Sequence, residues 1–251
     1  MPDPTLIFIA AVFALAGLVK GLIGLGLPTI AMGLLAGVMP PVQAAAILTL
    51  PSLVTNLWQM LAGPALAVVA RRLWSMMLAV CLGTWAGIGL MTGATARFGT
   101  ALLGVALVLY AASGLVALRF TVPRKWEPIL SPVVGAITGL ITAATGVFVI
   151  PAVPYLQAMG FEKDELVQAL GLSFTVSTVA LAVNVAIEGG LELSLGRAIV
   201  SALALACAGM WIGQAIRRRM SPVAFRKWFF AGLLLLGLYL AAVGGPTAPP
   251  Q

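Results

Sequence analysis

The chain reads GLVKGLIGLGLPTIAMGLL at residues 17–35 and GAITGLITAATGVFVIPAVPYLQAMG at residues 135–160. Both stretches are apolar but contain glycines and prolines, which bend or break helices. They belong to apolar segments 5–38 and 130–159, which as straight helices would measure about 50 and 45 Å at about 1.5 Å per residue. The hydrocarbon core of a bilayer is only about 30 Å thick. We therefore expect each segment to break near its middle.

The rest of the chain is equally apolar. Of its 251 residues, 61% are hydrophobic and 8% are charged, whereas soluble proteins are about 25% charged. Mean hydropathy is +1.11, and at about 20 residues per crossing the length allows roughly eight to ten crossings with no separate soluble domain. We predict an all-α integral membrane protein with a single transmembrane domain, residues 1–251. Beyond the two long segments, we expect spans at 42–62, 73–93, 98–118, 165–187, 198–216 and 224–243.

The two halves of the chain repeat one another. Gly17 and Gly21 match Gly135 and Gly139 at the same spacing. Further matches follow at slightly larger spacings: Ser52 with Ser173, and Arg71, Cys81, Gly83, Trp85 and Gly87 with Arg197, Cys207, Gly209, Trp211 and Gly213. We predict two repeats, about 5–118 and 130–243, joined by the basic loop 119–129. Each repeat is a broken or re-entrant helix pair followed by three transmembrane helices.

The distribution of basic residues predicts how the repeats are oriented. If each broken segment folds back, or makes two passes, eleven basic residues lie on one side of the membrane and only Arg97 and Arg197 on the other. If each segment crosses once, the counts are seven and six. Loops rich in Lys and Arg stay in the cytoplasm. We therefore predict inverted repeats with both termini outside the cytoplasm, an arrangement typical of secondary transporters.

The composition excludes most enzyme classes. The chain has no His and only two Cys, so His-based general bases, zinc sites and disulfide frameworks are not expected. Its basic residues lie in short loops between apolar segments, which indicates topology signals and lipid contact rather than nucleic-acid binding. We predict that the protein is not an enzyme and that it binds no metal, no cofactor and no nucleic acid.

The broken segments are the candidate functional site. A helix that begins inside the membrane leaves backbone N–H groups unpaired, and with the helix dipole these groups favour an anion. Residues at the two breaks that would line such a site are Gly24, Gly26, Thr29, Thr142, Thr145 and Gly146. The alternative is that the glycines only allow helices to pack closely, as small residues do in membranes.

Lys20 is the only charged residue within segment 5–38 and comes one residue before Gly21. Ionisable residues in such places are candidates for function, and an inward-facing Lys20 would supply positive charge for an anion. Alternatively its side chain extends to the membrane surface, or it caps carbonyl groups at the end of a half-helix.

A stripe of neutral polar residues follows each break. Thr49, Ser52, Asn56 and Gln59 share one face of span 42–62, and Ser173, Ser177 and Asn184 recur in span 165–187. From this stripe we expect Asn56, Gln59, Ser173 and Ser177 to hydrogen-bond a substrate. The alternative is that they form hydrogen bonds that only hold helices together.

These features resemble a known family. The two broken stretches are each followed by a polar-striped helix, AAAILTLPSLVTNLWQ at 44–59 and ELVQALGLSFTVSTVAL at 165–181. Together with GTWAGIGL at 83–90 and GMWIGQAI at 209–216, they resemble the TauE/SafE family over essentially the whole chain. The resemblance implies a multi-pass protein of the bacterial inner membrane that exports or transports sulfite, sulfonates or related organosulfur anions. Lys20 stands where a neutral residue is common in the family.

The sequence thus predicts a secondary transporter, an exporter by its resemblance, for a small anion such as sulfite or a sulfonate. The anion would bind near the middle of the membrane, between the inverted repeats. The expected partners are this anion and the lipid bilayer, and an oligomer is possible. The alternative is a membrane scaffold or accessory subunit without transport activity, in which the glycines and polar stripes serve packing alone.

Overall fold

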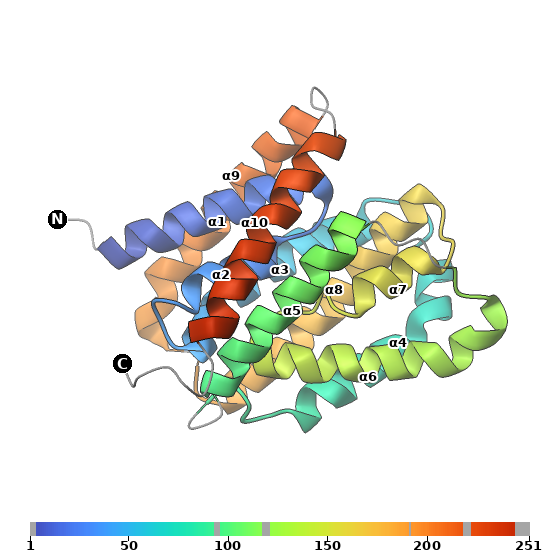
Figure 1. The fold of residues 1–251 in the computed structure, drawn as a ribbon, viewed down its shortest axis with the longest axis horizontal. Coiled ribbons are helices and arrows are strands. Elements are labelled where there is room, and N and C mark those ends of the chain that lie inside the picture. Colours follow the sequence, from blue (N-terminus) through green and yellow to red (C-terminus); the bar gives the residue numbers. More distant parts are fainter. Residues whose placement is uncertain (1–3, 93–95, 117–120, 191, 218–221, 244–251) are drawn as a thin grey trace.

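The computed structural model describes residues 4–92, 96–116, 121–190, 192–217 and 222–243 (Figure 1). Within these ranges the chain forms helices and no strands. The helices are α1 (Pro4–Ile23), α2 (Leu27–Leu35), α3 (Pro41–Leu61), α4 (Leu66–Ala86), α5 (Ala96–Val116), α6 (Glu127–Thr145), α7 (Ala152–Ala158), α8 (Lys163–Ile187), α9 (Gly196–Arg217) and α10 (Pro222–Val243). Short 3-10 turns lie at Arg124–Trp126 and Leu193–Leu195.

Most of these helices are long enough to cross a bilayer. Among the described residues, seven helices have the length and apolar composition of a membrane span, namely α1, α3, α4, α5, α6, α8 and α9. The described part of α10 adds a shorter apolar stretch, Phe230–Ala242. The prediction of an all-α, multi-pass integral membrane protein is confirmed.

Both long apolar segments are interrupted. Between α1 and α2, Gly24 and Gly26 have φ angles of 78° and 104°, a left-handed conformation that glycine adopts readily and other residues rarely do. The second segment is interrupted after α6 at Gly146, where φ is 69°, and helix resumes only at Ala152. The breaks therefore lie where the glycine and proline patterns place them, because few other residues allow the chain to turn so sharply.

One predicted span is wrong in its position. The expected span 73–93 is the helix Leu66–Ala86, which starts and ends earlier. Gly87 and Gly89, the latter with a φ of 91°, follow its last turn. At the other end, Arg71 and Arg72 lie inside the helix rather than in a preceding loop, because Arg72 has an acidic partner on α6.

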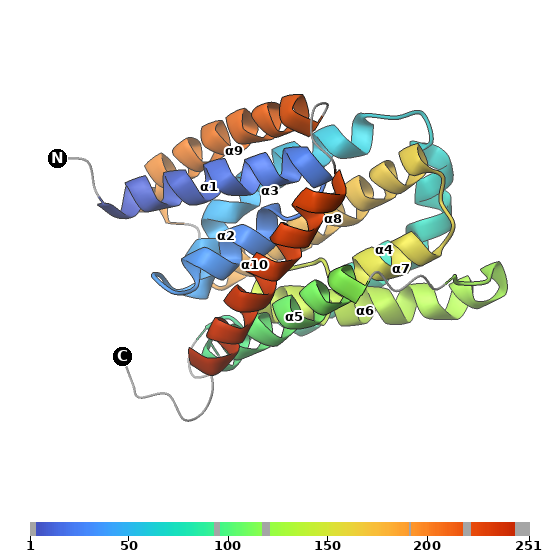
Figure 2. The ribbon, with the colours of Figure 1, turned by 45° about the horizontal axis from the view of Figure 1, so that its top comes forward.

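The first helix of the chain packs against a helix of the other half. α1 lies along α9 (Figures 1 and 2), and glycines form the contact. A Cβ atom at Gly17 or at Gly21 would collide with the carbonyl oxygen of Ala206 or of Met210 on α9. These glycines therefore bring two backbones into direct contact, as small residues do between membrane helices.

The second half packs in the same manner. α6 lies along α4, where a Cβ at Gly135 or at Gly139 would collide with the carbonyl oxygen of Met76 or of Val80. α3 packs against α8 and α5 against α10. The predicted repeat partners Gly17 and Gly135 thus have equivalent roles, each joining its own half to the other.

These contacts also give the direction of the helices. Residue numbers rise together along α6 and α4, so the two helices are parallel. α4 and α8 are parallel as well, since the Ala65 N–H donates to Gln168 Oε1 (2.7 Å) near the start of both, and Asn184 Nδ2 donates to the Thr84 carbonyl (2.9 Å) near their ends. α6 and α8 therefore run the same way, which requires the chain to return between them.

The returning stretch is residues 146–162, which include α7. In the first half α2 likewise turns back from the end of α1 and packs against it (Figures 1 and 2). Both broken segments thus fold back, as the distribution of basic residues favours. The inverted relation between the two halves stays a prediction.

Candidate functional site

Lys20 lies in the last turn of α1, next to the first break, and is only 4% exposed. Its Nζ donates hydrogen bonds to Thr55 Oγ1 (3.0 Å) and to Asn56 Oδ1, both on α3. The ion pair among the described residues joins Arg72 and Glu127, so no carboxylate in this part of the chain pairs with Lys20. The structure thus contains a buried lysine whose hydrogen bonds go to neutral partners.

The hydrogen bonds of Lys20 continue to α8. Asn56 Nδ2 donates to Thr178 Oγ1 at 3.1 Å, and the Thr178 hydroxyl in turn donates to the Phe174 carbonyl at 2.6 Å. The Thr55 hydroxyl donates to the Pro51 carbonyl at 2.8 Å. We call Lys20, Thr55, Asn56 and Thr178 the Lys20 network. It joins α1, α3 and α8, and all four side chains are buried.

Three buried serines lie on the helices of this network. Ser52 is one turn before Asn56 on α3, and Ser173 and Ser177 lie on α8 next to Phe174 and Thr178. All three are fully buried, and their hydroxyl oxygens have no hydrogen-bond partner among the described residues. A buried polar group without a partner costs about 1–3 kcal/mol. These hydroxyls are therefore available to a bound ligand or to water.

The first break contributes the start of α2. Gly26 is the residue that precedes its first turn, no side chain caps it, and Pro28 has no N–H to offer. The buried Thr29 hydroxyl donates to the Gly26 carbonyl at 2.9 Å, so it is already engaged. A Cβ at Gly24 would meet no atom within 4 Å. The backbone is therefore uncrowded at this end of the break.

At the second break, the hydroxyls bond within α6 and Gly146 contacts α2. The Thr142 and Thr145 hydroxyls donate within α6, to the Thr138 carbonyl (2.7 Å) and the Ile141 carbonyl (2.6 Å). A Cβ at Gly146 would collide with the Met32 side chain of α2. No described hydrogen bond joins Thr142, Thr145 or Gly146 to the Lys20 network.

Thr145 lies instead beside a shallow hollow that is too narrow to hold a water molecule. The hollow is also lined by Met32, Ala36, Pro41, Gly99, Thr100, Leu103 and Ala144. Its lining is mostly apolar, so it offers little to bind a charged group. The two breaks therefore differ in the chemistry that their surroundings present.

Gln59, also expected to bind substrate, connects two helices. Its Nε2 donates to the Val167 carbonyl of α8 at 3.2 Å. Gln168 directly follows Val167 on α8, and its Nε2 donates to the carbonyls of Met60 (2.9 Å) and Gly63 (2.6 Å). Two glutamines thus join the end of α3 to the start of α8. This matches the alternative of polar residues that hold helices together.

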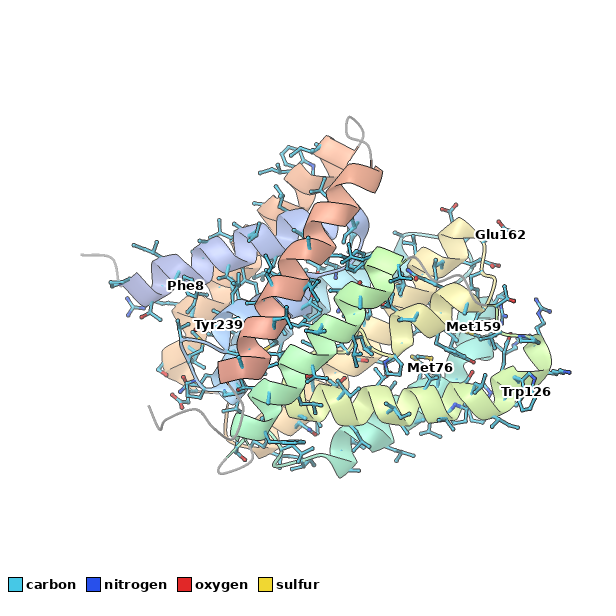
Figure 3. All side chains as sticks on the ribbon, in the orientation of Figure 1. Phe8, Met76, Trp126, Met159, Glu162 and Tyr239 are labelled. Atoms are coloured by element: carbon cyan, nitrogen blue, oxygen red, sulfur yellow. The ribbon has the colours of Figure 1, made fainter. Side chains whose placement is uncertain are left out.

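An ion pair that the sequence analysis missed anchors the second broken segment. Arg72 of α4 pairs with Glu127 at the start of α6, with Nε 2.9 Å from Oε2. Its guanidinium also donates to the Met159 carbonyl at 2.8 Å and lies 4.4 Å from the ring centroid of Phe161. Met159 and Trp126 mark this end of the molecule in Figure 3. α4, α6 and the chain after α7 are thereby tied together.

Sequence reasoning did not select Thr55 and Thr178 of the Lys20 network, Gln168, or the pair of Arg72 and Glu127. Thr55 adjoins Asn56 and lies three residues after Ser52, so the stripe on α3 already pointed to it. Thr178 follows Ser177 directly. Arg72 gave no such signal, because a basic residue near the end of an apolar span resembles a loop residue.

The fold and the buried Lys20 network define an integral membrane protein with a charged group inside its helix bundle. The family described as Sulfite exporter TauE/SafE matches residues 9–240, and the chain belongs to this family. The resemblance seen in the sequence is thus confirmed. Members of the family are transporters rather than enzymes. Comparison with curated proteins and with solved structures gives no match.

Proposed function

We propose that this protein is a secondary transporter that exports a small anion, such as sulfite, a sulfonate or a related organosulfur anion, across the bacterial inner membrane. The anion would bind near the middle of the bilayer, between the two halves of the chain. The observation that carries the proposal is the buried Lys20 ammonium, which has neutral partners only among the described residues.

A charge removed from water is costly unless an opposite charge accompanies it. An ammonium has three N–H donors, and Thr55 and Asn56 accept two hydrogen bonds from Lys20. The third donor is suited to an oxyanion, whose charge would compensate that of the lysine. Binding the anion would therefore relieve a cost that the protein already bears.

Neighbouring groups supply further donors. The hydroxyls of Ser52, Ser173 and Ser177 have no partner among the described residues and lie on the helices of the Lys20 network. The start of α2 follows Lys20 by less than two turns, and helix starts favour negative charge. Asn56 would orient the ammonium, and Gly24, Gly26 and Thr29 would shape the approach to the helix start.

Thr142, Thr145 and Gly146 enter the proposal differently. Gly146 lies against Met32 of α2, Thr145 lines the hollow that Met32 also lines, and Thr142 is one turn before Gly146. We propose that they form the opposite wall, which comes into contact with the anion when access alternates between the two sides. Gln59 has a structural role in this scheme, because its amide joins α3 to α8.

The membrane potential provides a driving force for export. A cytoplasm that is electrically negative favours exit of an anion by about 2.3 kcal/mol per charge per 100 mV. Export therefore needs no further source of energy. Exchange of the anion for a cation that enters the cell would increase the driving force.

The proposal is tested by sulfite efflux from proteoliposomes containing the wild-type protein or Lys20→Gln. We expect Lys20→Gln to reduce flux at least tenfold, since a hydrogen bond to a charged group contributes about 1.5–3 kcal/mol and about 1.4 kcal/mol corresponds to a factor of ten. The matched control is Lys125→Gln, which removes an exposed lysine between α5 and α6. Equal flux through Lys20→Gln and wild type would contradict the binding site. Absence of flux for every anion in the wild type would favour the scaffold alternative.

A further inference from the structure

Two buried oxygen atoms at the end of α8 accept no hydrogen bond. Asn184, 2% exposed, has its Oδ1 without a partner among the described residues, and the same is true of Glu188 Oε2. Both atoms are acceptors unless the carboxyl group is protonated. A third acceptor would not satisfy them, so they are suited to a hydrogen-bond donor, a proton or a positively charged ion.

The other polar atoms of these two side chains hold them in place. Asn184 Nδ2 donates to the Thr84 carbonyl at 2.9 Å, and Glu188 Oε1 accepts from the Gly89 N–H at 2.7 Å. Both side chains are thus attached to the end of α4 and the turn that follows it. Residues four apart on a helix are neighbours on its surface, so the two unpartnered oxygens belong to one small region.

The surroundings favour a positive charge. The region lies at the C-terminal end of α8, where the helix dipole is negative. The exposed Glu192 side chain accepts a hydrogen bond from Ser194, and the Arg197 side chain is exposed. Among the described residues no basic side chain pairs with Glu188.

The elements packed against α8 bring few titratable groups. α3 carries none, and Val42 near its start lies against Gly190. The titratable residues on the other elements are Arg71, Arg72 and Cys81 of α4, Glu127 of α6 and Tyr155 of α7. Of these, only Cys81 lies within a turn of Thr84, and Arg72 pairs with Glu127 far from this region. Apart from the exposed Glu192, Glu188 is therefore the carboxylate that this region offers among the described residues.

We propose that Asn184 Oδ1 and Glu188 Oε2 bind a small monovalent cation, a proton or Na⁺, whose binding is coupled to anion movement. This coupling rests on the proposed function, in which Ser173 and Ser177 of the same helix, α8, contribute to the anion site. A cation at the end of α8 would bias the position of the helix that lines the anion site. Ionisable residues in membrane segments commonly mark ion or proton pathways, and Glu188 directly follows the last residue of α8.

The site is tested first without any transported anion. The thermal unfolding temperature of the purified full-length protein is measured at acidic and alkaline pH, with Na⁺ or with N-methylglucamine as the only cation. The variant is Glu188→Gln, and the matched control is Glu192→Gln, on the loop after α8. A ligand that binds the folded state raises the unfolding temperature, so the two candidate cations give different results.

If the ligand is a proton, the wild type and the Glu192→Gln control have a higher unfolding temperature at acidic than at alkaline pH. Glu188→Gln then keeps that stability at alkaline pH, because its amide donates to Asn184 Oδ1. If the ligand is Na⁺, the wild type is stabilised by Na⁺ at alkaline pH and Glu188→Gln is not. A wild type and Glu188→Gln with the same response to pH and to Na⁺ would overturn the site.

Coupling is tested by sulfite flux under an imposed gradient of pH or Na⁺. We expect the wild type to respond to the gradient of the cation that stabilises it, and Glu188→Gln to lose this response. Cation-dependent stability without sulfite flux in the wild type would refute the proposed function and leave the cation site standing. Sulfite flux whose response to the gradients is the same in both proteins would refute the coupling and leave the anion transporter standing.

Discussion

The two broken segments share their packing and differ in their charge. In each, glycines press the helix before the break against a backbone of the other half, Gly21 against Met210 and Gly139 against Val80. The residue before the glycine is Lys20 in the first segment and Thr138 in the second. Lys20 carries a buried charge to α3, whereas the Thr138 hydroxyl donates to the Val134 carbonyl of its own helix.

The second segment has a charged contact of its own, but at its outer end. There Arg72 pairs with Glu127 and contacts the Met159 carbonyl. The comparison teaches that the repeated glycines build the scaffold, while the charges that are not repeated give each half a separate task. We infer that the first half supplies the positive charge of the anion site and that the second broken segment is anchored.

The largest effect is expected from variants that disrupt the glycine packing found in both halves. Gly21→Val and Gly139→Val each place side-chain atoms where a backbone carbonyl lies, and backbone has little room to yield. Overpacking costs about 1–3 kcal/mol even where side chains can adjust, so we expect almost no folded protein from either variant. Folded yield after size-exclusion chromatography is the measurement.

Gly24→Ala serves as the control for this pair. A methyl group there meets no atom within 4 Å, but the residue has a φ of 78°, which costs a non-glycine residue about 1–2 kcal/mol. We expect folded protein with reduced thermal stability. Similar yields from Gly21→Val, Gly139→Val and Gly24→Ala would show that close backbone contact is not what the repeated glycines provide.

The next prediction gives the first half the side chain of the second. Lys20→Thr removes the buried ammonium and leaves the glycine contacts intact. We expect sulfite flux to fall at least tenfold, by the same energetic argument as for Lys20→Gln, and the unfolding temperature to stay level or rise because a buried charge is removed. A variant that unfolds readily yet transports normally when folded would mean that Lys20 serves stability rather than binding.

A smaller effect concerns the anchor of the second half. Arg72→Lys keeps the charge but loses the two-point contact with Glu127 and the donor to the Met159 carbonyl. We expect a loss of about 1–2 kcal/mol in unfolding free energy, modest because both side chains are partly exposed. Thermal unfolding measures it. Arg124→Lys, at an exposed residue of the 3-10 turn before α6, is the control and should change little.

The smallest expected effect is a difference between the two cysteines in their protection from alkylation. Cys207 of α9 adjoins Ala206, whose carbonyl lies against Gly17, about one turn before Lys20 on α1, whereas its repeat partner Cys81 lies on α4, which packs along α6 and its Thr138. We expect methanesulfonate, an unreactive sulfonate, to slow thiol alkylation of Cys207 severalfold and to leave Cys81 unchanged. Alkylation is followed by mass spectrometry in Cys81→Ser and Cys207→Ser proteins. Equal protection of both thiols would argue against an anion site at Lys20.

The membrane class and the two breaks could be predicted from the sequence because they follow from local chemistry. Hydropathy and segment length determine which helices cross a bilayer, and Gly24, Gly26 and Gly146 occupy the left-handed turns that few other residues tolerate. The position of α4 was misplaced, because hydropathy does not distinguish a paired arginine inside a helix from a loop arginine. Arg72 can lie within α4 only because Glu127, distant in sequence, accepts its hydrogen bonds.

The candidate site was predicted in part. Lys20 and Asn56 were selected separately, one as a buried charge and the other from helical spacing, and the structure joins them. Thr142 and Thr145 were grouped with them because the halves repeat, yet their hydroxyls bond within α6. Periodicity identifies the face of a helix, but the partner of that face depends on how distant segments pack.

The glycine contacts between halves also bear on how the protein is made. α1 is synthesised well before α9, the helix whose backbone its glycine face contacts. α6, by contrast, finds α4 already inserted when it leaves the translocon. The contact between α4 and α6 can therefore form before α9 is made, whereas α1 should dock only after α9 has been inserted.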